Sequence, residues 1–204
     1  MRSAFVFLIL SMHLSCFSQS QEGLCFEIGP RAYTFRQGIV KSGLGLNVEK
    51  FISNEFSMNY HLSAGTVNTG FNRNAFTAHM PVGSALGCLL AASIFSTSHA
   101  NNNSLSLIPY CFIIPEGISY YPVRNDQVEF GLTADLLGIN YTSEKSMFMT
   151  SKFSYQQNFG MVFKMNTQKH RYLAARLGYQ IDFYSKNTLR GFNGSILIGF
   201  RDHP

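Results

Sequence analysis

A strict alternation of side-chain character is the feature that most constrains this chain. In residues 171–184, RYLAARLGYQIDFY, one set of alternate residues is apolar or aromatic, and the other set is mainly small, polar or charged. Successive side chains of a β-strand point to opposite faces, so this pattern predicts a strand with one apolar and one polar face. It leaves open which of the two faces points outward.

The same period of two recurs along the chain, in segments separated by Gly, Asn, Ser and Asp. It predicts eight strands. The fourth is irregular because both of its faces are apolar, and its two prolines and a glycine indicate a bend. The predicted strands are residues 24–34, 43–52, 56–67, 104–121, 127–139, 152–165, 171–184 and 191–201.

Composition and turn lengths favour a barrel in a membrane. Charged residues make up 13% of the 204 residues and aromatic residues 14%, a low-charge balance for a surface that contacts water. Strands of about 10 residues fit the length that crosses a bilayer core. The connections after strands two, four and six are tight, and the others are generally longer, as in barrels with short periplasmic turns and long outer loops.

The first 18 residues predict an export signal, which leaves residues 19–204 as one barrel domain. Arg2 precedes a short apolar core at residues 4–10, and small residues follow near Ser18. This core is too short for a spanning helix. Lipid modification of Cys16 is the alternative, although His13 occupies the place where a lipobox has leucine. The three cysteines beyond the leader imply no disulfide framework.

The polar faces hold Gly, Ser, Asn and Thr with single charges, which suits the narrow interior of an eight-stranded barrel better than a solvated exterior. Opposite charges there can pair and offset the cost of their desolvation. A secreted, soluble lipid-binding barrel with its apolar faces inward is the alternative. The residues predicted to form an interior polar network are Glu27, Arg31, Glu49, Glu129, Asp135, Arg176, Gln180, Asp182 and Arg201.

One segment does not fit the alternation. Residues 81–95 carry no charge and are rich in Ala and Leu, which predicts one short apolar helix between the third and fourth strands. This helix either plugs part of the interior or lies in lipid at the barrel wall. Glu116 follows at the bend of the fourth strand, where it is predicted to pair with an interior arginine.

In these features the chain resembles small bacterial outer-membrane β-barrel proteins of the OmpA-like or OmpX-like type. The resemblance rests on the signal sequence, the eight alternating strands and the final strand with Phe200 near its end. It implies an all-β, eight-stranded antiparallel up-and-down transmembrane β-barrel in the bacterial outer membrane. The implied partners are outer-membrane lipid, the barrel-assembly machinery, and an envelope or extracellular partner bound through the loops.

The resemblance implies a non-enzymatic role in envelope structure, adhesion or assembly. The architecture is porin-like, but eight strands with a side-chain-filled interior leave no open pore. Basic residues do not cluster into runs, which argues against a nucleic-acid partner. No cofactor is predicted, and the widely spaced histidines do not predict a metal site.

The alternative is a lipid-modifying barrel enzyme. His61 and Ser63 share one face of the third strand, so a base and a hydroxyl group would be neighbours. The pair resembles the His-x-Ser pair of outer-membrane lipid A deacylases. Here it is expected to face the interior, and the sequence shows no third member of a triad.

Overall fold

The computed structural model describes residues 23–68, 74–86, 114–168 and 170–202, so the predicted signal peptide lies outside the described residues. The described chain is almost entirely β-strand. The strands are β1 (Leu24–Phe35), β2 (Val40–Phe51), β3 (Phe56–Asn68), β4 (Asn74–Pro81), β5 (Gly117–Arg124), β6 (Val128–Thr142), β7 (Phe153–Gln168), β8 (Arg171–Phe183) and β9 (Thr188–Arg201).

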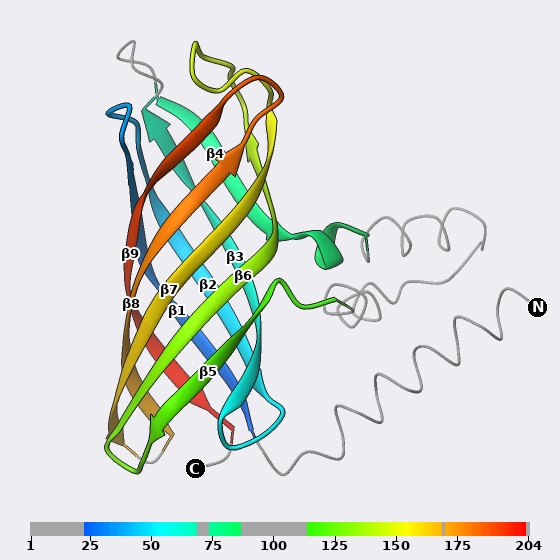
Figure 1. Cartoon of the computed structure of the whole chain (residues 1–204). Helices are drawn as coiled ribbons and strands as arrows, with labels where there is room; N and C mark the ends of the chain where they lie inside the picture. Colours follow the sequence, from blue (N-terminus) through cyan, green and yellow to red (C-terminus); the bar gives the residue numbers. More distant parts are fainter. Residues whose placement is uncertain (1–22, 69–73, 87–113, 169, 203–204) are drawn as a thin grey trace, which may run out of the picture.

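All neighbouring strands pair antiparallel, and β9 pairs with β1 to close the sheet into a barrel (Figure 1). Closure satisfies the backbone hydrogen bonds that an open edge would leave bare. Going round the wall, β4 and β5 share one position between β3 and β6. The wall is therefore eight strands wide, and the predicted eight-stranded antiparallel barrel is confirmed.

The shared position differs from the prediction. β4 pairs with one half of β3 and β6, and β5 pairs with the other half, so the chain leaves the wall after Pro81 and returns at Gly117. The predicted fourth strand, residues 104–121, is wrong as drawn, because the wall segment begins at Gly117 and residues 104–113 lie outside the described residues. No strand is predicted from the sequence where β4 lies, between residues 67 and 104.

The predicted short helix is present where the chain leaves the wall. Residues 82–86 are helical, and they lie outside the barrel rather than in its interior (Figure 1); residues 87–95 lie outside the described residues. A Cβ on Gly83 would come within 2.2 Å of the carbonyl oxygen of Ile114, so only glycine lets the outgoing and returning segments pack together. No helix in the described residues is long and apolar enough to cross a membrane.

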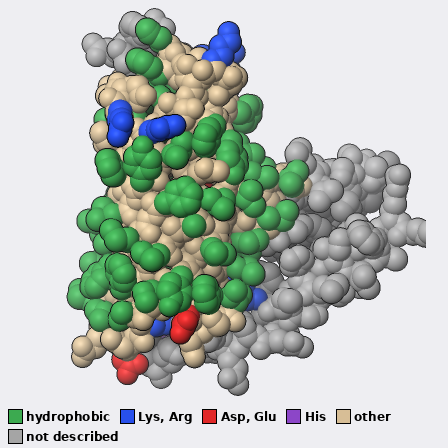
Figure 2. Space-filling model, viewed as in Figure 1, with side chains coloured by type: hydrophobic (Ala, Val, Ile, Leu, Met, Phe, Trp, Pro, Cys, Tyr) green, Lys and Arg blue, Asp and Glu red, His purple; other side chains and the backbone are tan. Residues whose placement is uncertain are grey.

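The barrel has an apolar exterior and a polar interior. On β8, Leu177 is 62% exposed whereas Asp182 is 0% exposed, and on β9 Ile196 is 61% exposed. Figure 2 shows hydrophobic side chains over the middle of the wall, with charged side chains near its ends. The apolar faces therefore point outward, and the alternative of a soluble barrel with apolar faces inward is wrong.

The predicted alternation of short and long connections is only partly present. The first and last connections, residues 36–39 and 184–187, are as short as the turn at residues 52–55. Strands β2 and β9 begin earlier than predicted, because Val40 and Thr188 continue the ladders with β1 and β8. The connection at residues 143–152 is long, as predicted.

Candidate functional site

Polar side chains fill the barrel interior in layers between its two ends. We call the end with the start of β1 and the end of β9 the termini end, and the other the opposite end (Figure 1). The structure places all nine predicted interior residues inside the barrel, but in separate groups rather than one network. Glu27, Arg31, Glu49, Glu129, Asp135, Arg176, Gln180 and Asp182 are buried, and the Arg201 side chain is 10% exposed.

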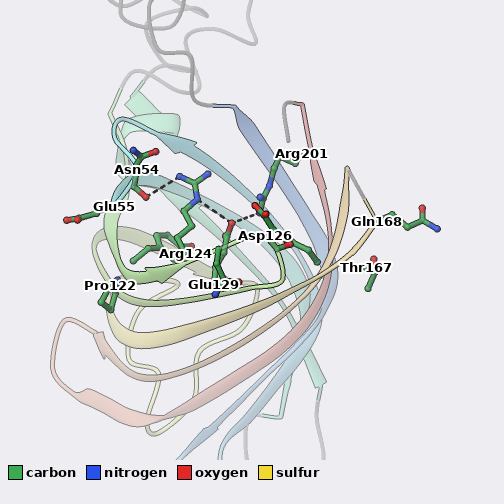
Figure 3. Close-up of a pocket in the computed structure, with 12 residues that line it drawn as sticks. Asn54, Glu55, Pro122, Arg124, Asp126, Glu129, Thr167, Gln168 and Arg201 are labelled. Carbon is green, nitrogen blue, oxygen red and sulfur yellow. Dashed lines mark hydrogen bonds and ion pairs between the residues drawn. The ribbon is translucent and has the colours of Figure 1, made fainter.

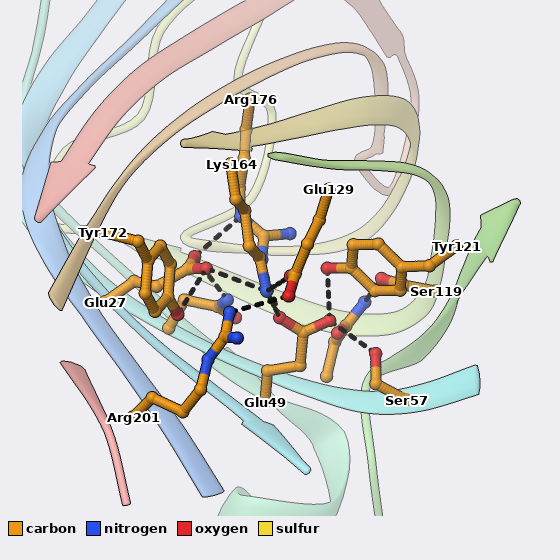
Figure 4. Close-up of polar contacts among 12 residues, drawn as sticks. Glu27, Glu49, Ser57, Ser119, Tyr121, Glu129, Lys164, Tyr172, Arg176 and Arg201 are labelled. Carbon is orange, nitrogen blue, oxygen red and sulfur yellow. Dashed lines mark hydrogen bonds and ion pairs between the residues drawn. The ribbon is translucent and has the colours of Figure 1, made fainter. Parts of the chain in front are cut away.

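The group nearest the termini end, which we call the lower cluster, is built around Glu27, Glu49 and Glu129 (Figure 4). Arg176 Nε donates to Glu27 Oε2 at 2.8 Å, and its Nη2 donates to Glu49 Oε2 at 3.4 Å. Arg201 Nη2 donates to Glu129 Oε1 at 2.8 Å. These bonds join strands that are not neighbours in the wall, β8 to β1 and β2 and β9 to β6, so they tie the wall together across the interior.

Lys164 on β7 lies at the centre of the lower cluster and is fully buried. Its Nζ donates to Glu49 and lies 3.5 Å from Glu27 Oε1 and 3.8 Å from Glu129 Oε2. The lysine therefore links all three carboxylates, which offsets the cost of burying them. Lys164 is not among the residues that the sequence predicts for the interior network.

Uncharged groups complete the hydrogen bonding of these carboxylates. Tyr121 Oη donates to Glu49 Oε1 at 2.6 Å, and Ser57 Oγ donates to the same atom at 2.5 Å. Tyr172 Oη donates to Glu27 Oε1 at 3.0 Å. The acceptor lone pairs of both carboxylates are thus used inside the protein, as a buried charge requires.

A second group, which we call the histidine clamp, lies where the wall position passes from β4 to β5. Glu116 lies just before β5. Its Oε1 is 2.9 Å from His79 Nε2, and its Oε2 is 3.3 Å from His61 Nδ1. Asp135 lies 3.6 Å from the same His61 nitrogen and accepts from Asn158 at 3.0 Å. Two carboxylates and two imidazoles thus meet in one buried layer.

Glu116 also supplies the backbone hydrogen bonds that the split wall position lacks. Its N–H donates to Asn59 O at 2.8 Å, and its carbonyl accepts from Leu136 N–H at 2.9 Å and Leu137 N–H at 3.0 Å. Its carboxylate accepts from the backbone N–H of His61 at 3.1 Å. One residue therefore bridges β3 and β6 where neither β4 nor β5 reaches.

The prediction that Glu116 pairs with an interior arginine is wrong, because its partners are two histidines. His79 lies between the third and fourth predicted strands, so the sequence analysis does not predict its inward position. The signal was present: Ala75, Thr77 and His79 are small or polar and alternate with exposed Phe76 and Met80.

The third group lies toward the opposite end. Lys41 Nζ donates to Asp182 Oδ2 at 2.5 Å, and Gln180 Nε2 donates to Asp182 Oδ1 at 2.7 Å. Arg31 lies apart from these pairs, with its guanidinium 6.0 Å from the centre of the Tyr33 ring. The sequence does not predict Lys41 as an interior residue, because the predicted second strand begins at residue 43 whereas β2 begins at Val40.

An apolar cluster caps the interior at the opposite end. It is formed by Tyr33, Phe35, Ile39, Val67, Ala75, Met149, Tyr184 and Leu189. Met149 comes from the long connection between β6 and β7, which folds back over the barrel mouth. The cap and the lower cluster each fill the interior with packed side chains.

The candidate enzymatic pair does not form a nucleophile and base. His61 Nδ1 faces Glu116 and Asp135, and its Nε2 has no hydrogen-bond partner in the described part of the chain, so Ser63 is not hydrogen-bonded to it. His61 is also buried in the interior, away from the apolar exterior. Carboxylate partners for the histidine are present, but the activated hydroxyl and access for an acyl chain are not.

Groups of three or more side chains arranged to hold a metal ion are absent from the described residues.

Comparisons with known proteins found no matching protein-family profile and no matching curated protein sequence. Solved structures do match. The N-terminal β-barrel domain of OprF from Pseudomonas aeruginosa is similar over 88% of this chain and 100% of that chain, with a TM-score of 0.45 and 9% identity. Ail, the attachment invasion locus protein of Yersinia pestis, is similar over 88% and 97%, with a TM-score of 0.47 and 8% identity.

A structure from a study of the de novo design of transmembrane β-barrels is similar over 90% of this chain and 98% of that chain, with a TM-score of 0.41 and 10% identity. The closed pairing of the strands, described above, is what establishes the fold of this protein.

Proposed function

We propose that this protein is a non-enzymatic β-barrel of the bacterial outer membrane, with a role in envelope structure, adhesion or assembly. The observation that carries the proposal is the distribution of polarity, with an apolar band on the outside of a closed barrel and charged clusters inside. A barrel in lipid needs both features, because no water is present to satisfy a bare strand edge or an outward charge.

The proposal includes the partners that such a location requires. Outer-membrane lipid covers the apolar band, and the barrel-assembly machinery inserts the chain. An envelope or extracellular partner contacts the connections at the opposite end, of which residues 143–152 offer the longest described surface. The termini end, which holds the start of β1 and the end of β9, faces the periplasm in this arrangement.

Substituting Leu177 with arginine tests the lipid-facing assignment. Leu177 is near the middle of β8 and points outward, so the charge would lie near the bilayer midplane. We expect Leu177→Arg to destabilise the barrel by roughly 2–4 kcal/mol. Folding into lipid vesicles, followed by the heat-dependent shift in gel mobility, measures the effect.

The matched control is Met165→Arg, which places the same charge on the outside near the termini end of β7. Its cost should fall to about 1 kcal/mol or less because the arginine reaches the interface. Equal costs at the two positions, or a wild type that folds as a soluble monomer without lipid or detergent, would contradict the membrane location.

We also expect the protein to conduct no steady ionic current. The apolar cap and the lower cluster both block the interior, and an eight-stranded barrel is filled by its own side chains. Recordings in planar bilayers, with a porin of about 16 strands as the positive control, measure this. A stable open level in the wild type would show that the interior opens.

A further inference from the structure

The termini end of the barrel contains a cavity of about 800 Å³ (Figure 3). It lies directly below the lower cluster, and the turns at residues 52–55 and 125–127 and the end of β7 form its rim. The size matches sites that hold small molecules. The apolar band on the outside and the polar pairs deeper inside give this cavity no role.

Two arginines on opposite sides of the barrel converge at the floor of this cavity. Arg124 Nε donates to Glu129 Oε1 at 3.3 Å, and Arg201 Nη2 donates to the same oxygen at 2.8 Å. A shared carboxylate oxygen therefore brings the two guanidinium groups together, as Figure 3 shows.

Both guanidinium groups are held in place by further contacts. That of Arg124 lies 3.8 Å from the centre of the Phe51 ring, and its Nη1 donates to Asn54 O at 3.2 Å. That of Arg201 lies 5.1 Å from the centre of the Tyr172 ring. These ring contacts and hydrogen bonds restrain both guanidinium groups before any ligand arrives, which lowers the entropic cost of binding.

At the floor itself, two guanidinium groups, those of Arg124 and Arg201, share one carboxylate, that of Glu129. The other cations of the lower cluster, Lys164 and Arg176, are enclosed deeper in the barrel, where they pair with Glu27 and Glu49.

Two acidic side chains, Glu55 and Asp126, also line the cavity, but both are exposed in turns, where water screens them. Glu55 points away from the arginines (Figure 3). The side chains of Asn166, Thr167 and Gln168 add amide and hydroxyl groups to the rim. The cavity thus combines a cationic floor with a hydrogen-bonding wall.

We propose that this cavity binds the oxyanion group of a small polar ligand, a carboxylate or a phosphate, against Arg124 and Arg201. Guanidinium forks match the geometry of both groups with paired, charge-assisted hydrogen bonds. Amides on the rim hydrogen-bond the polar remainder of the ligand. The proposal does not depend on which membrane holds the barrel, since it requires only that the termini end meets water.

The test is a titration of isotope-labelled protein, folded in detergent micelles, that follows the Nε–H signals of Arg124 and Arg201 by NMR. The probes are inorganic phosphate, acetyl-Ala-Ala with a free carboxylate, and the same peptide with a C-terminal amide. We expect saturable shifts of both signals with phosphate, with the free acid, or with both, and none with the amide. Which oxyanion saturates at the lower concentration identifies the source that the site prefers.

Variants separate recognition from a general charge effect. Arg124→Gln should weaken binding by about tenfold or more, because one charge-assisted pair is lost. Arg124→Lys keeps the charge but lacks the fork and should also weaken binding, whereas Arg36→Gln, in the turn at the opposite end, should leave it unchanged. Heat-dependent gel mobility confirms that each variant is folded.

Three outcomes would overturn the proposal. They are shifts that sodium chloride of equal ionic strength reproduces, binding of the amide as tight as that of the acid, and an affinity that Arg124→Gln leaves intact.

Discussion

Replacing Lys164 with methionine is expected to destabilise the barrel by about 3–5 kcal/mol, the cost of leaving a buried carboxylate without its partner. Lys164 is fully buried and contacts Glu27, Glu49 and Glu129. Methionine fills similar volume, so the loss of charge rather than of packing dominates. Urea unfolding in lipid vesicles, followed by gel mobility, measures the change.

Two further variants serve as controls for the effect of Lys164→Met. Lys152→Met removes an exposed lysine before β7 and should change the free energy of unfolding by less than about 0.5 kcal/mol. Adding Glu49→Gln to Lys164→Met should recover part of the loss, because fewer unpaired carboxylates then remain in the cluster. If Lys164→Met is no more costly than Lys152→Met, the lower cluster does not stabilise the barrel.

Glu116→Ala is expected to cost about 3 kcal/mol or more, because it leaves His61 and His79 without their shared carboxylate in the interior. It also removes the acceptor of the His61 backbone N–H, at the place where the wall is split. Glu116→Gln keeps an acceptor oxygen and should cost less. Urea unfolding in vesicles measures both variants.

Amide hydrogen exchange distinguishes this local effect from a general loss of stability. In Glu116→Ala we expect the His61 amide to exchange faster, with little change for amides in the β8–β9 ladder. Glu144→Ala, an exposed carboxylate in the connection before β7, is the control. A His61 amide as protected in Glu116→Ala as in the wild type would show that the carboxylate does not close the wall.

The histidine clamp explains how the fold tolerates the departure of the chain from its wall. A strand that leaves a sheet in its middle exposes N–H and C=O groups of both neighbours, which is costly in lipid. Here a single residue, Glu116, bridges the neighbours with its backbone and its side chain. The gap lies between Met80 and Ile118, which are exposed on the outside of the barrel. In the proposed membrane location, no water can replace the missing hydrogen bonds there.

Much of the interior could be predicted because alternate residues of each strand point to opposite faces, so the sequence of a strand shows which residues share a face. Alternation with apolar neighbours predicts an inward position for Glu27, Arg176 and Asp182, and the structure buries all three. Lys41 and His79 were missed because their segments were read as connections. The grouping into a lower cluster and a histidine clamp could not be predicted. Alternation assigns a residue to the inner or outer face, but it does not give the position of the residue along the barrel axis or its partner.

The sequence by itself determined most of the strands and which residues share a face, because alternation is a local property. Only the tertiary structure decided the splitting of one wall position between β4 and β5, the partners of Glu116, and the cavity floored by Arg124 and Arg201. These depend on the register and tilt of strands that are distant in the chain. Register brings together residues such as Glu129 and Arg201, 72 positions apart, and no local pattern encodes that meeting.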